Sequence, residues 1–329
     1  MFYQHISPIF ESMTNASQPH IFFRNFFIAS WVAFLCFCFN TFSQTLDYGT
    51  YQFDTVPIKM KPLGVEDFIK AIQKDTSLYR AFKNLRVFNH LEYSKVAVMD
   101  KKGGEKALLS RTTKHHNKNN FSWVTVEKEK VEGKYYDRKG EHRYLTARMF
   151  DYVFLPQDTA FASNTVLNPY KQKDMDDLST MDKYYEQLKT FVFSPGTGVD
   201  GVMFIGDKLD IFSKEMRPLY DFSLDKITIE DSIPCYKFLC KKKDEVSDRK
   251  VVIQYIETIY DRRTMNIIRR KYRVVDSHLA FDFDITMSVE LQKIGNEYFP
   301  VFVKYAGDWD TILQRRERIG FTIYTKLLE

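Results

Sequence analysis

The sequence predicts a mainly β (α+β) fold: one large curved antiparallel sheet or incomplete barrel, with two or three covering helices. The first observation behind this prediction is that apolar and polar residues alternate at period two in many segments. The second is that short polar turns join these segments in sequence order, which favours an antiparallel meander. The third is that few stretches show the three- and four-residue apolar spacing of a helix.

The N-terminal region carries the pattern of an export signal. An apolar run at residues 26–39 follows the cation Arg24, and the small residues Thr41 and Ser43 come after it. Fourteen residues reach roughly 21 Å as a helix, which is short for a hydrocarbon core of about 30 Å. We therefore expect a signal peptide cleaved near Ser43/Gln44. An uncleaved N-terminal anchor is the alternative.

This signal sets the predicted organisation of the chain. Residues 1–43 form the signal peptide, residues 44–60 an extended N-terminal segment and residues 61–329 a single antiparallel-sheet domain. No repeat and no low-complexity linker divides the last part. The mature protein is expected in the periplasm or associated with the outer membrane.

The elements that follow are predicted from local patterns. Amphipathic helices are expected at residues 65–73 and 78–88, the second capped by Asp75 or Ser77, and another at residues 180–191 after an acidic loop. Strands are expected at residues 92–99, 107–112, 121–131, 142–154, 251–260, 265–275, 298–305 and 320–328. A further strand starts at Tyr220 and is expected to bend at Asp225 and Lys226 before its apolar phase changes.

The clearest pattern is at residues 281–291, where six apolar residues alternate with polar ones. Such a segment is a long strand with one buried face. Cys235 and Cys240 stand five positions apart, so on a strand their side chains face apart and a disulfide is not expected. Both are interpreted as buried small apolar residues.

The histidines and possible nucleophiles form no recognisable metal-binding or catalytic motif in the sequence. His115 and His116 lie in a polar segment, TKHHNKNN, interpreted as a solvated loop, and His90, His142 and His278 are isolated in sequence. We expect no metal site, no cofactor and no catalytic residue, since no GxSxG motif or metal-ligand spacing is present.

The charge distribution limits the classes of partner that the protein is expected to bind. The formal net charge of +5 comes from cations mixed with nearly as many acids, which argues against nucleic-acid binding. Arg269, Arg270, Lys271 and Arg273 form a cationic cluster. It is either a solvated strand face or a contact for an anionic membrane surface.

Two segments carry a family resemblance. Residues 81–103, AFKNLRVFNHLEYSKVAVMDKKG, and residues 221–243, DFSLDKITIEDSIPCYKFLCKKK, resemble the opening helix and strand pattern of the periplasmic lipoprotein-carrier superfamily, the LolA and LppX type. The resemblance implies an incomplete barrel whose apolar concave face holds acyl chains.

The leading hypothesis is therefore an exported, non-enzymatic envelope protein that binds a lipid or lipoprotein acyl chain. Its expected lining residues are Phe281, Phe283, Ile285, Met287 and Val289 on one strand, with Phe222 and Leu224 opposite. A structural or assembly protein of the envelope with a solid core is the alternative. A hydrolase with an unidentified site is the third possibility.

Overall fold

The computed structural model describes residues 63–73, 75–155, 158–164, 206–230, 232–277, 281–311 and 314–328. The chain divides into two units, residues 1–60 and 61–329, and the described residues all lie in the second. The predicted signal peptide, the segment at residues 44–60 and the helix predicted at residues 180–191 lie outside the described residues. Within the described part, no helix is long and apolar enough to cross a membrane.

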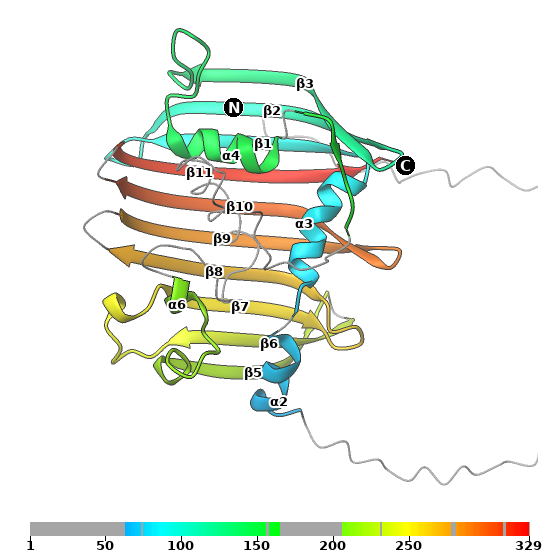
Figure 1. Ribbon diagram of the computed structural model, residues 1–329, viewed down its shortest axis with the longest axis vertical. Helices are drawn as coiled ribbons and strands as arrows, with labels where there is room; N and C mark the ends of the chain where they lie inside the picture. Colours follow the sequence, from blue (N-terminus) through cyan, green and yellow to red (C-terminus); the bar gives the residue numbers. More distant parts are fainter. Residues whose placement is uncertain are drawn as a thin grey trace, which may run out of the picture. The chain divides into compact units, whose positions relative to one another are not determined.

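Eleven strands of the described residues form one open antiparallel sheet (Figure 1). They are β1 (His90–Met99), β2 (Glu105–Lys118), β3 (Phe121–Gly133), β4 (Ala160–Phe161), β5 (Tyr220–Ile229), β6 (Ile233–Lys242), β7 (Ile253–Asp261), β8 (Ile267–Ser277), β9 (Phe281–Ile294), β10 (Glu297–Thr311) and β11 (Gln314–Leu327). Their spatial order is β4-β3-β2-β1-β11-β10-β9-β8-β7-β6-β5. The predicted mainly β fold with a large antiparallel sheet is confirmed.

One pairing departs from a simple meander. Strand β1 pairs with β11 along its whole length, from His90 opposite Leu327 to Met99 opposite Arg318. The other neighbours in the sheet are adjacent in sequence order. The sheet therefore joins an N-terminal set, β1–β4, to a C-terminal set, β5–β11, through this one long-range pair.

The described helices and short 3-10 turns lie among these strands. They are α2 (Val65–Ile72), α3 (Ser77–Val87), α4 (Leu145–Phe154), α6 (Gly206–Leu209), η2 (Arg217–Leu219) and η3 (Asp248–Lys250). Helices α3 and α4 lie across the same face of the sheet, called here the helix-covered face (Figure 1). Asp75 accepts hydrogen bonds from the backbone N–H and hydroxyl of Ser77, at 2.9 and 3.0 Å, where α3 begins. The predicted first two helices are confirmed.

The strand predicted at residues 142–154 is wrong, because most of it forms α4. Its apolar residues are dense enough to fit either element by periodicity alone. The buried residues include Met149, Phe150 and Phe154, whose spacing places them on one side of a helix.

The predicted bend at Asp225 and Lys226 is also wrong. Strand β5 runs unbroken to Ile229 and pairs with β6 without a change of register. Pairing with β6 therefore keeps β5 continuous across Asp225 and Lys226. Cys235 and Cys240 on β6 are buried free thiols, as expected, and burial raises the pKa of both thiols.

The apolar face of β9 is confirmed as part of the core. Phe283, Ile285, Met287 and Val289, called here the apolar strip, are all at most 5% exposed. Met287 also accepts a hydrogen bond at its Sδ from the Tyr272 hydroxyl, at 2.9 Å. The side chain of Phe281 lies outside the described residues.

Candidate functional site

An apolar pocket lies between α4 and the helix-covered face of the sheet, and its cavity volume is about 50 Å³. Helix α4 supplies one wall and strands β8 to β11 supply the floor. The lining residues are Thr146, Met149, Phe150, Val153, Phe154, Tyr272, Val274, Ile285, Tyr305, Trp309 and Phe321.

The polar tips among the lining residues are already bonded within the protein. Trp309 donates its Nε1–H to the Tyr305 hydroxyl oxygen at 2.7 Å, and Thr146 donates its hydroxyl to Glu317 at 2.7 Å. The Tyr272 hydroxyl binds the Met287 sulfur. The pocket therefore offers a ligand mainly apolar and aromatic surface.

A glycine makes the floor of the pocket possible. The ring of Tyr305 stacks on Phe321, with centroids 4.7 Å apart and planes 6° apart. A Cβ atom at Gly307 would lie 2.3 Å from the Tyr305 hydroxyl oxygen, closer than side chains allow. Gly307 thus leaves the space that the Tyr305 ring occupies.

The N-terminus of α4 is capped from the sheet. The Glu317 carboxylate on β11 accepts the backbone N–H groups of Leu145 and Thr146, at 3.0 and 3.1 Å. The N-cap residue itself, Tyr144, makes no side-chain cap. A carboxylate at this end of a helix satisfies free N–H groups and also opposes the positive end of the helix dipole.

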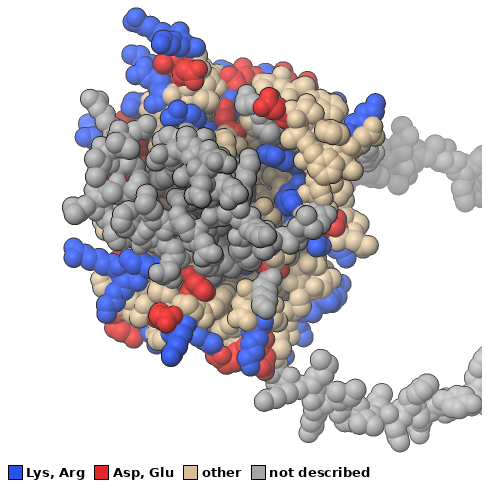
Figure 2. Space-filling view, in the orientation of Figure 1, with Lys and Arg blue, Asp and Glu red and all other residues tan. Residues whose placement is uncertain are grey.

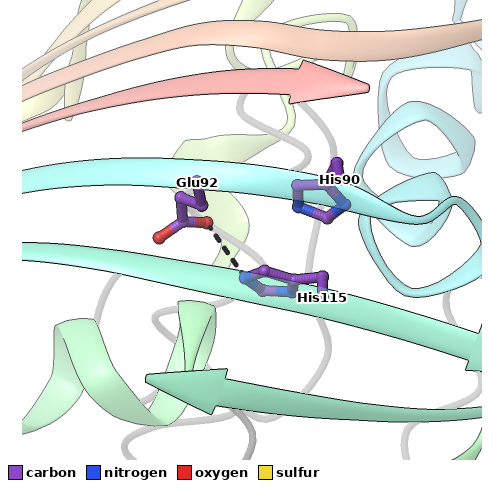
Figure 3. A group of neighbouring side chains, drawn as sticks. All are labelled: His90, Glu92 and His115. Carbon is purple, nitrogen blue, oxygen red and sulfur yellow. Dashed lines mark ion pairs between the residues drawn. The ribbon is translucent and has the colours of Figure 1, made fainter. Parts of the chain in front are cut away.

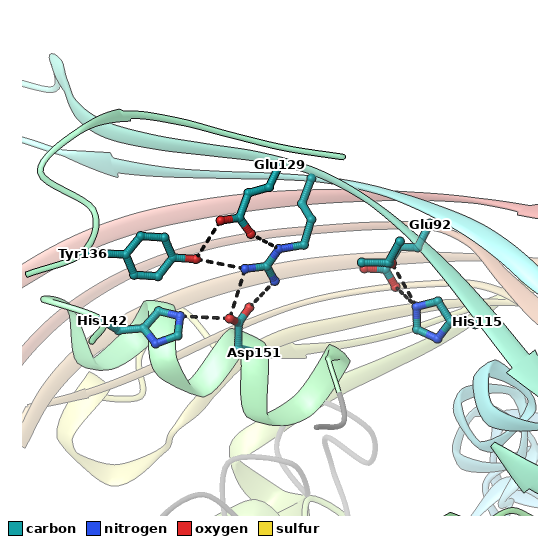
Figure 4. Close-up of polar contacts among 8 residues, drawn as sticks. Glu92, His115, Glu129, Tyr136, His142 and Asp151 are labelled. Carbon is teal, nitrogen blue, oxygen red and sulfur yellow. Dashed lines mark hydrogen bonds and ion pairs between the residues drawn. The ribbon is translucent and has the colours of Figure 1, made fainter. Parts of the chain in front are cut away.

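A second charged contact holds the middle of α4 (Figure 4). Arg111 on β2 donates to both carboxylate oxygens of Asp151, at 2.7 and 3.2 Å, and His142 lies 2.9 Å from the same carboxylate. Arg111 also pairs with Glu129 at 2.8 Å. Despite burial, the hydrogen bonds from His142 and Arg111 hold the pKa of Asp151 below its usual value.

Arg111 belongs to a row of buried polar residues on the helix-covered face of β1 and β2. Positions two apart on a strand share a face, and the register places Glu92 opposite Thr113 and Ser94 opposite Arg111. Each member of the row is at most 5% exposed. The row, called here the polar strip, comprises His90, Glu92, Ser94, Arg111, Thr113 and His115.

Two histidines and a carboxylate meet at one end of the polar strip (Figure 3). His90 lies directly opposite His115 in the register, and their rings stack with centroids 4.1 Å apart. The Glu92 Oε2 atom is 3.7 Å from His115 Nε2. The three residues could hold a metal, since one ligand atom from each lies within 4.8 Å of the others.

Burial keeps this group uncharged near neutral pH. It lowers the pKa of His90 to about 4 and that of His115 to about 3, the latter with help from neighbouring positive charges. Burial raises the pKa of Glu92 to about 8, although Arg111 opposes the rise. The contact between Glu92 and His115 is therefore not a charged pair at neutral pH.

The interpretation of TKHHNKNN as a solvated loop is wrong for His115, and His90 is not isolated in space. His115 lies within β2 and is 5% exposed. His116 is on the other face, where its ring stacks on Trp123 with centroids 5.0 Å apart. The sequence does mark this shared strand face, because polar residues stand at every second position in H-x-E-x-S (residues 90–94) and in R-x-T-x-H (residues 111–115).

The expected lining residues divide between two places. Ile285 lines the pocket, and Phe283 contacts the lining residue Trp309 at a centroid distance of 5.2 Å. Met287 and Val289 continue the same buried face of β9. Phe222 and Leu224 lie on β5, four strands from β9, and are not among the lining residues of this pocket.

The cationic cluster on β8 is split by the alternation of the strand. Arg269 pairs with Glu290 at 3.0 Å, and Arg273 pairs with Asp284 at 2.7 Å. Arg270 points to the other face, where it donates to Thr258 at 3.0 Å, while Lys271 is exposed on the face of Arg269. Figure 2 shows positive and negative side chains interspersed on the described surface of the view.

No family model matches the chain, and no curated protein matches its sequence. It is similar to a solved DUF1329 family protein from Desulfovibrio piger, with 11% identity, TM-score 0.24, and 78% of this chain and 91% of that one covered. A Vibrio parahaemolyticus protein described as an outer membrane lipoprotein-sorting domain has 8% identity, TM-score 0.26, and 78% and 94% covered. A LolA superfamily protein from Nitrosomonas europaea has 10% identity, TM-score 0.22, and 78% and 95% covered.

The last of these three is described as a member of the LolA superfamily, which the sequence pattern also resembles. At these identities and TM-scores, the likenesses support no statement about the family or the activity of this chain.

Proposed function

We propose that this protein is a non-enzymatic envelope protein that binds the acyl chain of a lipid or lipoprotein beneath α4. The observation that carries the proposal is the pocket itself. Its lining is apolar or aromatic apart from Thr146, and the polar tips are bonded internally. Each methylene group buried there contributes roughly 0.8 kcal/mol, so affinity needs no catalytic or charged group.

The pocket is too small to hold an acyl chain without a change in conformation. Dry cavities of roughly 150 Å³ accommodate benzene, and this pocket has a volume of about 50 Å³. An acyl chain therefore enters only if the covering wall moves. Helix α4 is the element to move, because it covers the pocket with apolar side chains. Its charged contacts with Glu317 and Arg111 hold it closed and would have to open as the chain enters.

Native mass spectrometry of the full chain, purified from an envelope fraction and followed by lipid extraction, tests the proposal. We expect a lipid mass on the wild-type protein. Val153→Trp fills the pocket from α4 and should remove that mass, while Arg148→Trp, on the exposed side of α4, should keep it. The same spectrum tests cleavage near Ser43/Gln44, because the cleaved chain begins at Gln44.

A folded wild-type protein with no bound lipid, or a Val153→Trp variant that retains its lipid, would contradict the proposal. The first result favours the alternative, an envelope assembly protein with a solid core. The packing of Phe283, Met287 and Val289 into the continuous core is the observation in favour of that alternative. Its next test is capture of envelope partners.

A second and independent part of the proposal concerns contact between the outer surface of the sheet and a membrane. Arg269, Lys271 and Arg273 lie on one exposed face of β8, where they are candidates for contact with an anionic membrane surface. Two of the three are already paired with carboxylates of β9, which weakens their attraction for lipid headgroups.

A further inference from the structure

The stacked histidines at the end of the polar strip have an unused coordinating atom. His90 Nδ1 is 2.9 Å from the backbone carbonyl oxygen of Phe88. A carbonyl oxygen only accepts hydrogen bonds, so Nδ1 carries the proton and Nε2 carries a free lone pair. That Nε2 is buried and has no hydrogen-bond partner.

A second buried polar atom without a hydrogen-bond partner lies on the same strand, and it can bind an ion once the Glu92 carboxyl loses its proton. Glu92 is 3% exposed, and its Oε2 atom also lacks a hydrogen-bond partner. Native proteins seldom leave buried polar atoms unsatisfied, and a bound ion is one way in which such atoms are satisfied. Two such atoms, on residues that share one strand face, point to a ligand that accepts both lone pairs.

The third member completes a coordinating set from the neighbouring strand. His115 Nε2 is 3.7 Å from Glu92 Oε2 and 3.1 Å from the Thr113 hydroxyl oxygen. Binding of an ion at this nitrogen would replace the hydrogen bond with Thr113. The ring of His90 also meets Phe299 edge to face, with centroids 5.1 Å apart. Because the two imidazole rings stack within 19° of parallel, the His115 ring must turn for both nitrogen lone pairs to reach one ion.

We propose that His90, Glu92 and His115 bind a divalent transition-metal ion of the Zn²⁺ class, which joins β1 to β2. Two imidazole nitrogens and one carboxylate oxygen suit Zn²⁺ and similar ions, whereas Ca²⁺ and Mg²⁺ require oxygen ligands. The hydrogen bond from His90 to a backbone carbonyl is the outer contact that metal-binding histidines usually make.

The surroundings indicate a structural role for the ion. All three residues are at most 5% exposed, and aromatic packing from Phe299 and Phe88 closes one side. The C-terminal end of α3 is adjacent, and the carbonyl groups at this end of a helix favour a cation. The ion would fix the register of β1 and β2 at the open end of their hairpin, opposite the turn that joins them.

The test uses the full chain stripped with a chelator and titrated with Zn²⁺ against a chromophoric competitor. We expect one tightly bound Zn²⁺ per chain. Glu92→Gln keeps the shape of the side chain and should weaken binding at least about tenfold, as should His115→Gln. His116→Gln is the matched control, since His116 is the next residue in sequence but lies on the other face, and it should bind as the wild type does.

Thermal unfolding provides a second readout that does not depend on the competitor. Zn²⁺ should raise the melting temperature of the wild type and of His116→Gln, and should leave that of Glu92→Gln unchanged. If the folded wild type binds no Zn²⁺, or if Glu92→Gln binds it as tightly as the wild type, the proposal is overturned.

Discussion

The helix-covered face of the sheet contains two strips of equally buried side chains with opposite chemistry. The polar strip on β1 and β2 places histidines, a carboxyl and a guanidinium in the interior, while the apolar strip on β9 places only apolar and aromatic groups there. Two strands, β11 and β10, separate them. Burial alone therefore does not define a binding face in this protein.

Helix α4 connects the two kinds of surface. Phe150 and Phe154 pack on Phe321 of β11, with ring centroids 4.9 and 5.4 Å away. Asp151, from the same helix, is bound to Arg111 in the polar strip. The apolar contacts are non-directional and the ionic one is specific, so we infer that the polar strip fixes where α4 lies over the apolar pocket.

The largest expected effect comes from breaking the ionic contact on one side only. Arg111→Leu removes the cation that Asp151 and Glu129 share and leaves Asp151 with its contact to His142, and should lower the free energy of unfolding by about 3–5 kcal/mol. The double variant Arg111→Leu/Asp151→Leu removes both buried charges and should recover most of that loss. Urea unfolding measures both. A double variant as unstable as the single one would show that the apolar contacts of α4 depend on the ion pair.

A smaller expected effect is the pH dependence of stability, which reports on the polar strip alone because the apolar strip contains no titrating group. The lowered pKa values of His90 and His115 mean that the unfolded chain binds more protons below pH 6.5, so stability rises as pH rises to that value. The raised pKa of Glu92, about 8, means that the folded chain binds more protons between pH 4.5 and 8, so stability falls over that range.

Two histidines outweigh one carboxyl below pH 6.5, and Glu92 acts alone above it. We therefore expect a stability maximum near pH 6.5 in metal-free protein, followed by a fall of about 2 kcal/mol toward pH 8. Asp151, whose pKa is lowered, contributes only in more acidic solution. Urea unfolding in chelator across this range is the measurement. Glu92→Gln should flatten the fall above pH 6.5, and an unchanged fall would assign it to another group.

The smallest effect concerns the cap of α4. Glu317→Gln removes the negative charge that faces the first N–H groups of the helix, and should cost about 1 kcal/mol. Glu290→Gln, which breaks an exposed pair with Arg269, is the control and should cost less than about 0.5 kcal/mol. Equal losses in thermal unfolding would mean that Glu317 acts as an ordinary surface charge.

Local patterns were sufficient for most of the sheet. The period-two alternation at residues 281–291 reports the buried face of β9 directly, because neighbouring side chains on a strand point to opposite faces. The sequence could not identify α4 in the same way. Its capping residue, Glu317, follows Leu145 by 172 positions, so no local signal marks where the helix begins.

The polar strip was missed for a related reason. His90 and Glu92 share a strand face by spacing, which the sequence does reveal. Their meeting with His115, however, depends on the register of β1 against β2, and that register follows from the whole hairpin. A lone histidine in a polar segment gives no information on which side of a sheet it will lie.

The pairing of β1 with β11 has a consequence for the order of events during synthesis. Strand β11 follows the other described strands in sequence, yet it lies between β1 and β10 in the sheet. A ribosome therefore releases the ten other strands of the described residues before the one that joins their two sets. Until β11 pairs with both of its neighbours, β1 and β10 each lack a partner along one edge, and contacts of such long sequence separation form slowly. The protein completes its interior only once β11 has emerged.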